Sequence, residues 1–144
     1  MAFTGNFVCT SFKVELMTAT HNFTLSTGNT FNIALYDNSA SFTAATTAYT
    51  ATNEVSGTAY VAKGNTLVNV TPVSSSTTAY TDFGDSTWSS STITARGAMI
   101  FNDTASGDPS VVILDFGSDK VSSSGDFVVV FPTANSTSAI IRIA

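Results

Sequence analysis

Hydrophobic and polar residues alternate along much of this chain with a period of two residues. In the segment 31–36, whose sequence is FNIALY, residues Phe31, Ile33 and Leu35 fall on one face of an extended backbone. The segment 92–101 has the same alternation, with threonine and arginine on its polar face. Alternation of this kind is typical of strands that pack one face against a core. The sequence therefore predicts β-strands over both segments.

Two further segments are apolar on both faces, as expected for strands in the middle of a sheet. These are 111–116 and 126–131, and Pro132 ends the second because proline cannot continue a central strand. The last six residues, 139–144, also predict a paired strand. Weaker alternation predicts additional strands at 57–62, 66–71 and 78–83.

Clusters of Gly, Asn, Asp and Ser separate these segments and predict turns between them. One segment has a different period: in Thr10–Met17, Phe12 and Leu16 lie four residues apart. This spacing, with Thr10 or Ser11 as an N-cap, favours two turns of helix over the alternative of a strand. The predicted turns lie at 63–65, 84–86, 102–109 and 122–125.

The segment 37–56 is the longest stretch without a clear pattern. It consists mainly of Ala, Thr and Ser, and its large side chains are Phe42 and Tyr49. Loops longer than about 12–15 residues are usually functional or mobile. We therefore expect either a binding loop or an irregular edge strand.

Composition places these strands in one domain spanning residues 1–144. The chain contains 24 Thr and 20 Ser, only 10% of its residues are charged, and 11 Phe provide material for a core. These features predict an all-β fold, a single β-sandwich of jelly-roll type, with an immunoglobulin-like strand order as the alternative. The net charge of −5, without a basic cluster, argues against nucleic-acid binding. Neither a signal peptide nor a stretch suited to a membrane is expected.

The tripeptide Asp-Phe-Gly occurs twice, at 82–84 and 115–117, and each copy is followed by another acid. We interpret it as a recurring strand-to-turn solution, in which Phe points inward, Gly takes an unusual backbone angle and Asp caps the turn. If the two turns were neighbours, the carboxylates of Asp82, Asp85, Asp115 and Asp119 would suit calcium. Turn capping is the favoured interpretation, and no metal or cofactor is predicted.

No set of residues with the pattern of an active site is visible. His21 is the only histidine and Cys9 the only cysteine, so a structural role is favoured over a Cys–His dyad, and no internal disulfide can form. The two glutamates, Glu15 and Glu54, fall in the predicted helix and the long loop, not as a glycosidase pair. Trp88 is expected in the core and not on a sugar-binding surface. The sequence thus predicts that the protein is not an enzyme.

Five segments of the chain look familiar together: SFKVEL at 11–16, FNIALY at 31–36, AYTATNEVSG at 48–57, ITARGAMIFN at 93–102 and LDFGSDK at 114–120. They resemble a family of small structural proteins of tailed bacteriophages and prophages, and the resemblance extends from about residue 7 to Ala144. Within tailed phages, small all-β proteins of this size resemble capsid cement (decoration) proteins. The resemblance implies a virion protein made in the host cytoplasm that binds the major capsid protein and copies of itself, as a trimer, and stabilises the shell.

Two other functions remain open at this point. One is a tail, baseplate or head-fibre component that recognises a host surface or a sugar, and the other is a virion-associated hydrolase. For the virion role, two groups of aromatic residues are the candidate protein contacts. Phe3, Phe7 and Phe12 form an N-terminal arm that either inserts into a neighbour or packs on its own sandwich, while Phe42 and Tyr49 belong to the long loop.

Overall fold

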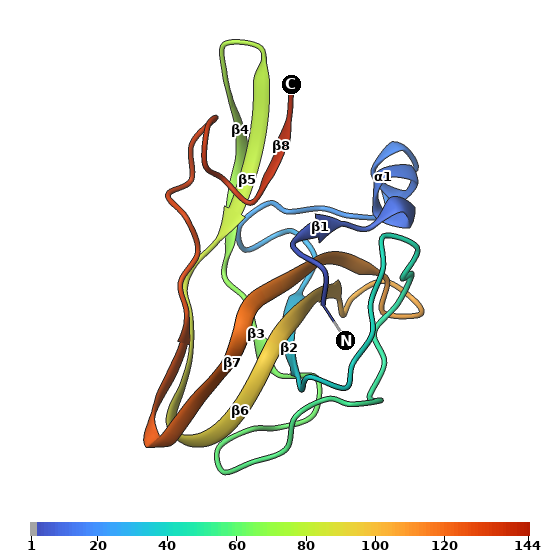
Figure 1. The fold of residues 1–144 in the computed structure, drawn as a ribbon. Helices are drawn as coiled ribbons and strands as arrows, with labels where there is room; N and C mark the ends of the chain where they lie inside the picture. Colours follow the sequence, from blue (N-terminus) through green and yellow to red (C-terminus); the bar gives the residue numbers. More distant parts are fainter. Residues whose placement is uncertain (1–2) are drawn as a thin grey trace.

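A computed structural model describes residues 3–144 and consists of two antiparallel sheets and one short helix (Figure 1). The first sheet has the strand order β1-β7-β6-β2-β3 and the second the order β4-β5-β8. The prediction of an all-β sandwich is therefore confirmed, whereas the jelly-roll connectivity stays a prediction. Within residues 3–144, no helix is long and apolar enough to cross a membrane.

The predicted helix is present as α1, Thr10–Met17, with the expected bounds. Its expected cap is wrong: Cys9 occupies the N-cap position, and no side chain there makes a capping hydrogen bond. The reason is tertiary, because the amide of Thr10 donates instead to the carbonyl of Ala44, at 2.8 Å. Phe12 is the buried residue of this helix.

Strand β2, Phe31–Tyr36, confirms the first predicted strand, but all six of its residues are buried. It lies between β6 and the two-residue strand β3, Asn65–Thr66. Its second face is covered as well, since Phe42 of the long loop packs against the Tyr36 ring at 4.7 Å, so the expectation of one solvated face is wrong for this segment. The segment 57–62 forms no strand; it makes only an isolated bridge between Thr58 and Thr92.

A row of phenylalanine rings joins the helix, the first sheet and the second sheet into one core. Phe23 and Phe31 stack with ring centroids 4.4 Å apart and an interplanar angle of 5°. Phe12 packs on Phe23 at 6.0 Å, and Phe83 lies 5.7 Å from Phe31 and 5.8 Å from Phe131. These five rings are all buried, which explains the high phenylalanine content of a chain with few charges.

The longest element is a ribbon formed by β6, Ser86–Asn102, and β7, Ser110–Val129. The predicted strands at 92–101 and 111–116 are parts of it, and β7 continues to Val129, so most of the segment 126–131 belongs to the same strand. Figure 1 shows that the ribbon bends sharply at the lower left, which divides it into two arms.

The bend replaces the turn that the serine cluster at 122–125 predicts. Ser90 and Ser124 each have φ of 52°, and the pairing register shifts between Trp88 and Ile93. The hydroxyls of Ser91 and Ser122 are buried and 2.7 Å apart across the ribbon. Small hydroxylated residues thus bend two paired strands together at bulges without ending either of them.

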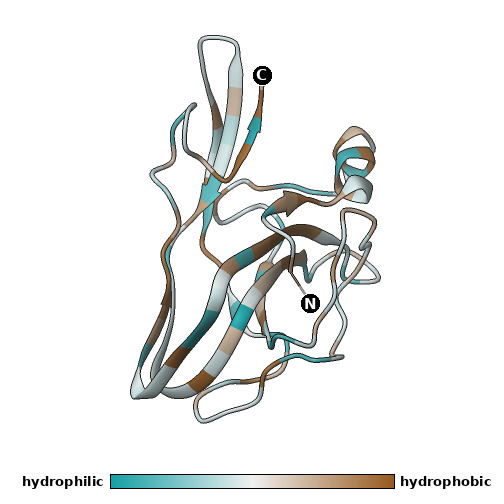
Figure 2. Cartoon of the chain, in the orientation of Figure 1, coloured by the Kyte–Doolittle hydropathy of each residue, from teal (hydrophilic) through white to brown (hydrophobic). Residues whose placement is uncertain are grey.

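The second sheet contains β4, Asn69–Ser75, β5, Thr78–Phe83, and β8, Ile141–Ile143. The predicted strand at 78–83 is confirmed, that at 139–144 is present in shorter form, and that at 66–71 is divided between β3 and β4. The hairpin of β4 and β5 projects from the body (Figure 1). Figure 2 shows this hairpin mostly in pale colours, whereas the strongly hydrophobic segments concentrate in the body.

Candidate interaction surface

The outer edge of β7 is unpaired over most of its length. β1, Phe7–Val8, pairs only with Ile113 and Val112 of β7. Just beyond, the side chain of Asn6 accepts a hydrogen bond from the amide of Asp115, at 2.6 Å. Within residues 3–144, no strand pairs with this edge of β7 after that point. We call the stretch from Phe116 to Val129 the β7 edge.

Other edges of the two sheets carry features that discourage strand addition. β4 contains Pro72 and a register shift between Val70 and Val73, and β3 has only two residues. Prolines, bulges and short edge strands are the usual means of preventing edge-to-edge pairing. The β7 edge is long and contains no proline, but it has register shifts of its own, opposite Ala95–Gly97 and at the bend, so its free backbone groups lie in separate short stretches.

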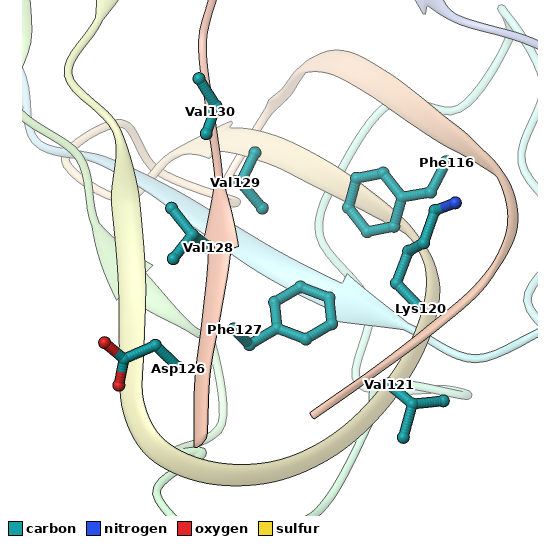
Figure 3. A pocket seen from close by; sticks show the side chains of 8 residues that line it. All are labelled: Phe116, Lys120, Val121, Asp126, Phe127, Val128, Val129 and Val130. Carbon is teal, nitrogen blue, oxygen red and sulfur yellow. The ribbon is translucent and has the colours of Figure 1, made fainter. Parts of the chain in front are cut away.

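The concave side of the bend holds a cleft of about 420 Å³ next to this edge (Figure 3). The rings of Phe116 and Phe127 come from the two arms of β7, point into the cleft, and have centroids 6.3 Å apart. A second cleft of about 450 Å³ shares Phe116, Val129 and Val130 with the first and extends to Phe7 and Ile140. Together these two clefts form one apolar groove, which we call the β7 groove.

Valines cover the outward face beside the groove. Val128 and Val130 are 45% and 72% exposed, and they alternate with the buried Phe127 and Val129. Val121, on the other arm, is 68% exposed. Exposed apolar side chains that gather beside a groove are typical of protein contact surfaces.

Two charged residues line the cleft without an ionic partner among the residues described. The ammonium group of Lys120 contacts the hydroxyl of Ser118 at 3.0 Å, and the carboxylate of Asp126 accepts a hydrogen bond from the amide of Ser90 at 3.1 Å. By contrast, Asp115 on the same strand is paired with Arg96 at 3.2 Å. Lys120 lies on the face of β7 opposite the buried Ala95, whereas Asp126 lies on the outward face beside Val128, as Figure 3 shows, so the two charges point to different sides of the strand.

Three of the predicted contact residues are in the protein's own core. Phe3, Phe12 and Phe42 are 2%, 1% and 5% exposed, so the folded chain does not offer them to a partner. Phe42 packs edge-on against Phe3 at 5.7 Å and against Tyr36 at 4.7 Å. The N-terminal arm therefore packs on its own sandwich, the second of the two alternatives, because its rings fill space that this core provides.

Of the other predicted contacts, Phe7 lines the β7 groove, whereas Tyr49 faces inward. The Tyr49 ring lies 4.7 Å from that of Phe101, and its hydroxyl donates to Glu54. Burial and the adjacent Glu54 carboxylate raise the pKa of Tyr49 to about 12. The same carboxylate accepts hydrogen bonds from the Tyr60 hydroxyl and the Lys63 amide, both at 2.7 Å. The long loop is thus irregular but anchored through Glu54.

The carboxylates considered for calcium do not assemble into a site. No group of three or more His, Cys, Asp or Glu side chains suited to a metal occurs within residues 3–144. The buried carboxylate of Asp82 accepts hydrogen bonds from the amides of Phe83 and Ile140, at 2.9 and 3.2 Å. Asp115 instead accepts from the amides of Gly117 and Gly5 and pairs with Arg96. Both carboxylates are therefore hydrogen-bonded or ion-paired to groups of the chain itself.

His21 and Trp88 occupy the structural positions expected of them. The two ring nitrogens of His21 contact Glu15 at 2.7 Å and Asn102 at 3.0 Å, so both are engaged by other side chains of the chain. Cys9 is buried, and burial raises its pKa, which disfavours the reactive thiolate. Trp88 is 3% exposed and packs against Phe127, so it forms no surface platform for a sugar.

The groove itself was not found from the sequence. The run Val128-Val129-Val130 indicates a buried central strand, whereas the structure exposes two of its three side chains. The available signal was the pair of charges, Lys120 and Asp126, on either side of a serine-rich bend.

No family model matches this chain, and searches of curated proteins and of solved structures likewise find no match.

Proposed function

We propose that this protein is a structural component of a tailed-phage virion, and specifically a capsid cement protein that binds the outer shell and stabilises it. The observation that carries the proposal is the exposed valine face beside an unpaired strand edge. Such a surface suits permanent assembly, because it offers apolar area and backbone hydrogen bonds with few charges that must be desolvated. The resemblance to phage structural proteins adds the class of particle.

The remainder of the molecule supports a mechanical role. His21, Asp82 and Asp115 each have their polar atoms engaged by other groups of the chain. The core is joined by stacked rings and needs no disulfide, which suits a protein assembled in a reducing cytoplasm. The many Ser and Thr on the surface give hydrogen-bonding capacity with little charge. Each of these features favours a rigid binding protein over an enzyme.

Shell stability is the direct test of this proposal. Capsids with and without the protein would be heated and osmotically shocked, and we expect those without it to break at lower stress. Equal survival would contradict the cementing role. The number of copies per virion, measured by mass spectrometry against the major capsid protein, separates the alternatives: near-equal numbers support a cement protein, and a few copies favour a tail or fibre component.

The contact face has its own test. Val128→Thr with Val130→Thr keeps the size of both side chains while making the outward face polar. We expect the doubly substituted protein to fold but to occupy fewer sites on the shell. Val73→Thr is the matched control, because Val73 is 50% exposed but lies on β4. Equal loss of occupancy in both proteins would contradict the assignment of the contact to this face.

A further inference from the structure

The β7 groove is an apolar trough with a lysine at one end. We propose that this groove binds a fatty-acid anion, whose hydrocarbon chain lies along the groove and whose carboxylate pairs with the ammonium group of Lys120. Such binding goes beyond the proposed function, because it needs only the isolated chain and not a virion. It also makes no use of the free backbone groups of the β7 edge.

The shape and lining of the groove suit a hydrocarbon chain. Its two clefts, of about 420 and 450 Å³, share Phe116, Val129 and Val130, and the second continues along Phe7 and Ile140. Sites for small ligands are typically concave, about 300–1,000 Å³ in volume, and lined mainly by apolar side chains with a few polar groups that fix the orientation. An alkyl chain placed along these walls is stabilised by the apolar surface that it buries.

A hydrocarbon chain fits this site better than a peptide does. An extended peptide brings an N–H and a C=O group at every residue, and each is costly to bury without a hydrogen bond. The β7 edge offers no regular row of partners for them, because its pairing register shifts opposite Ala95–Gly97 and at the bend. An alkyl chain needs only the apolar walls.

Lys120 supplies a cation where one end of the groove opens. It is paired in register with the buried Ala95, so its side chain starts on the inner face of β7, and Figure 3 shows it beside the ring of Phe116. Its ammonium group contacts the hydroxyl of Ser118 at 3.0 Å, and no carboxylate within residues 3–144 pairs with it. Lys120 lines the first cleft but not the second, which places the cation at one end.

The carboxylates beside the groove leave this cation available to an incoming anion. Asp115 is paired with Arg96 at 3.2 Å. Asp126 points to the outward face, away from Lys120, and accepts a hydrogen bond from the Ser90 amide at 3.1 Å. The charge that faces the groove is therefore positive, although the chain has a net charge of −5. Charge complementarity thus favours an anionic head group over a neutral or a cationic one.

Calorimetric titration of the purified chain tests the proposal with three probes: decanoate, 1-decanol and decyltrimethylammonium. They share one hydrocarbon chain and differ in the head group. We expect decanoate to bind saturably, with one molecule per chain, and more tightly than the other two. Added salt should reduce the preference for decanoate over decanol, because salt screens exposed charges. An absence of saturable binding, or decanol binding as tightly as decanoate, would overturn the proposal.

Two substitutions separate the contribution of the head group from that of the chain. Lys120→Met keeps a long side chain and removes the charge, so decanoate should bind about fivefold more weakly while decanol binds at least as well as before. Phe116→Ala removes part of the apolar wall, so both probes should bind more weakly by a similar factor. An unchanged affinity of Lys120→Met for decanoate would contradict the assignment of the carboxylate to Lys120.

Lys13→Met is the matched control, because it makes the same substitution at an exposed lysine of α1, outside the groove. We expect it to bind decanoate as the native chain does. If Lys13→Met and Lys120→Met lose affinity equally, the attraction comes from net charge and the groove assignment is wrong. Fluorescence of the buried Trp88 verifies that each variant is folded. Because these titrations use purified protein, a failure to bind decanoate and a failure to stabilise capsids are separate results.

Discussion

The two Asp-Phe-Gly copies have the same sequence but lie in different environments. In the copy on β5, Asp82 is 1% exposed and Phe83 is part of the phenylalanine row. In the copy on β7, Asp115 is paired with Arg96, and Phe116 lines an open groove. Gly117 has φ of +77°, a left-handed conformation that Gly84 does not adopt. The tripeptide therefore does not specify one local structure.

The expectation that both Asp-Phe-Gly copies end a strand in the same kind of turn is wrong. The first copy does end a strand, at Phe83, but the second lies within β7, which continues for more than ten residues beyond it. Phe points into the core in the first copy only, and Gly takes an unusual backbone angle in the second only. A segment of three residues is too short to dictate its surroundings, and neighbouring elements decide which property is used.

The largest expected difference concerns the two phenylalanines. Phe83→Ala removes a ring that is 3% exposed and contacts Phe23, Phe31 and Phe131, so it should lower the free energy of unfolding by about 3–5 kcal/mol. Phe116→Ala removes a half-buried ring beside the groove and should cost about 1–2 kcal/mol. Urea unfolding followed by Trp88 fluorescence measures both. Equal losses would contradict the assignment of Phe83 to the core and Phe116 to the groove.

The aspartates should differ at neutral pH. Asp115→Asn removes the charge that pairs with Arg96 and weakens the hydrogen bonds to the Gly5 and Gly117 amides, at an expected cost of about 1–3 kcal/mol. Asp82→Asn removes a buried charge that no cation within residues 3–144 pairs with, and it keeps one acceptor oxygen, so its stability should stay within about 1 kcal/mol of the native value. The same unfolding experiment compares them. A larger loss for Asp82→Asn would reverse this ranking.

The glycines provide a smaller difference of opposite sign. Gly117→Ala places a side chain in the left-handed region and should cost about 1 kcal/mol, although no atom obstructs the new methyl group. Gly84→Ala meets Val68 at an ordinary contact distance of 3.5 Å and should be neutral or stabilise the fold by up to about 1 kcal/mol. Thermal unfolding of the two variants measures this, and a loss on Gly84→Ala equal to that on Gly117→Ala would be the contrary result.

The pH dependence of stability gives the finest comparison. Hydrogen bonds from the Gly117 amide and the Arg96 guanidinium lower the pKa of Asp115 below 3.8. The contribution of Asp115 to the free energy of unfolding is therefore complete above pH 3.8 and is lost as pH falls through the pKa of the folded state. Burial raises the pKa of Asp82 above 3.8, so stability is lost as pH rises from that value through the folded pKa. Unfolding free energies from acidic to neutral pH should show Asp82→Asn gaining on the native chain as pH rises.

For Asp115→Asn, the deficit relative to the native chain should shrink as pH falls below 3.8. Parallel pH curves for the native chain and both variants would contradict the opposite assignments of the two carboxylates. In the native chain the pH dependences of the two aspartates add together. Asp115→Asn keeps only that of Asp82, and Asp82→Asn keeps only that of Asp115.

Strands with a strong local pattern were the most predictable part of the fold. The segment 31–36 and the helix Thr10–Met17 appear with the expected bounds, because spacing of apolar residues determines which backbone conformation buries them together. The serine clusters were misread, since serine is common both in turns and in bulged strands. Only the pairing of Ser91 with Ser122 distinguishes these cases.

The candidate surface was harder to predict than the fold. Phe3, Phe12 and Phe42 were contact candidates because large aromatic side chains are common at interfaces, but the same property fills cores. Val128 and Val130 lie in an apolar run that is typical of a buried strand. Whether such a run is covered depends on which other segments reach it, and those segments are far away in the sequence.

The sequence by itself determined that this chain folds as an all-β protein with one short helix and a phenylalanine-rich core, because these properties follow from residue spacing and composition. Only the tertiary structure decided where the ribbon of β6 and β7 bends, which carboxylates are paired and which strand edge stays open. These features depend on contacts between distant segments, such as Asn6 with Asp115 and Phe83 with Phe131. Local patterns determine the elements, whereas long-range packing determines which surfaces remain for a partner.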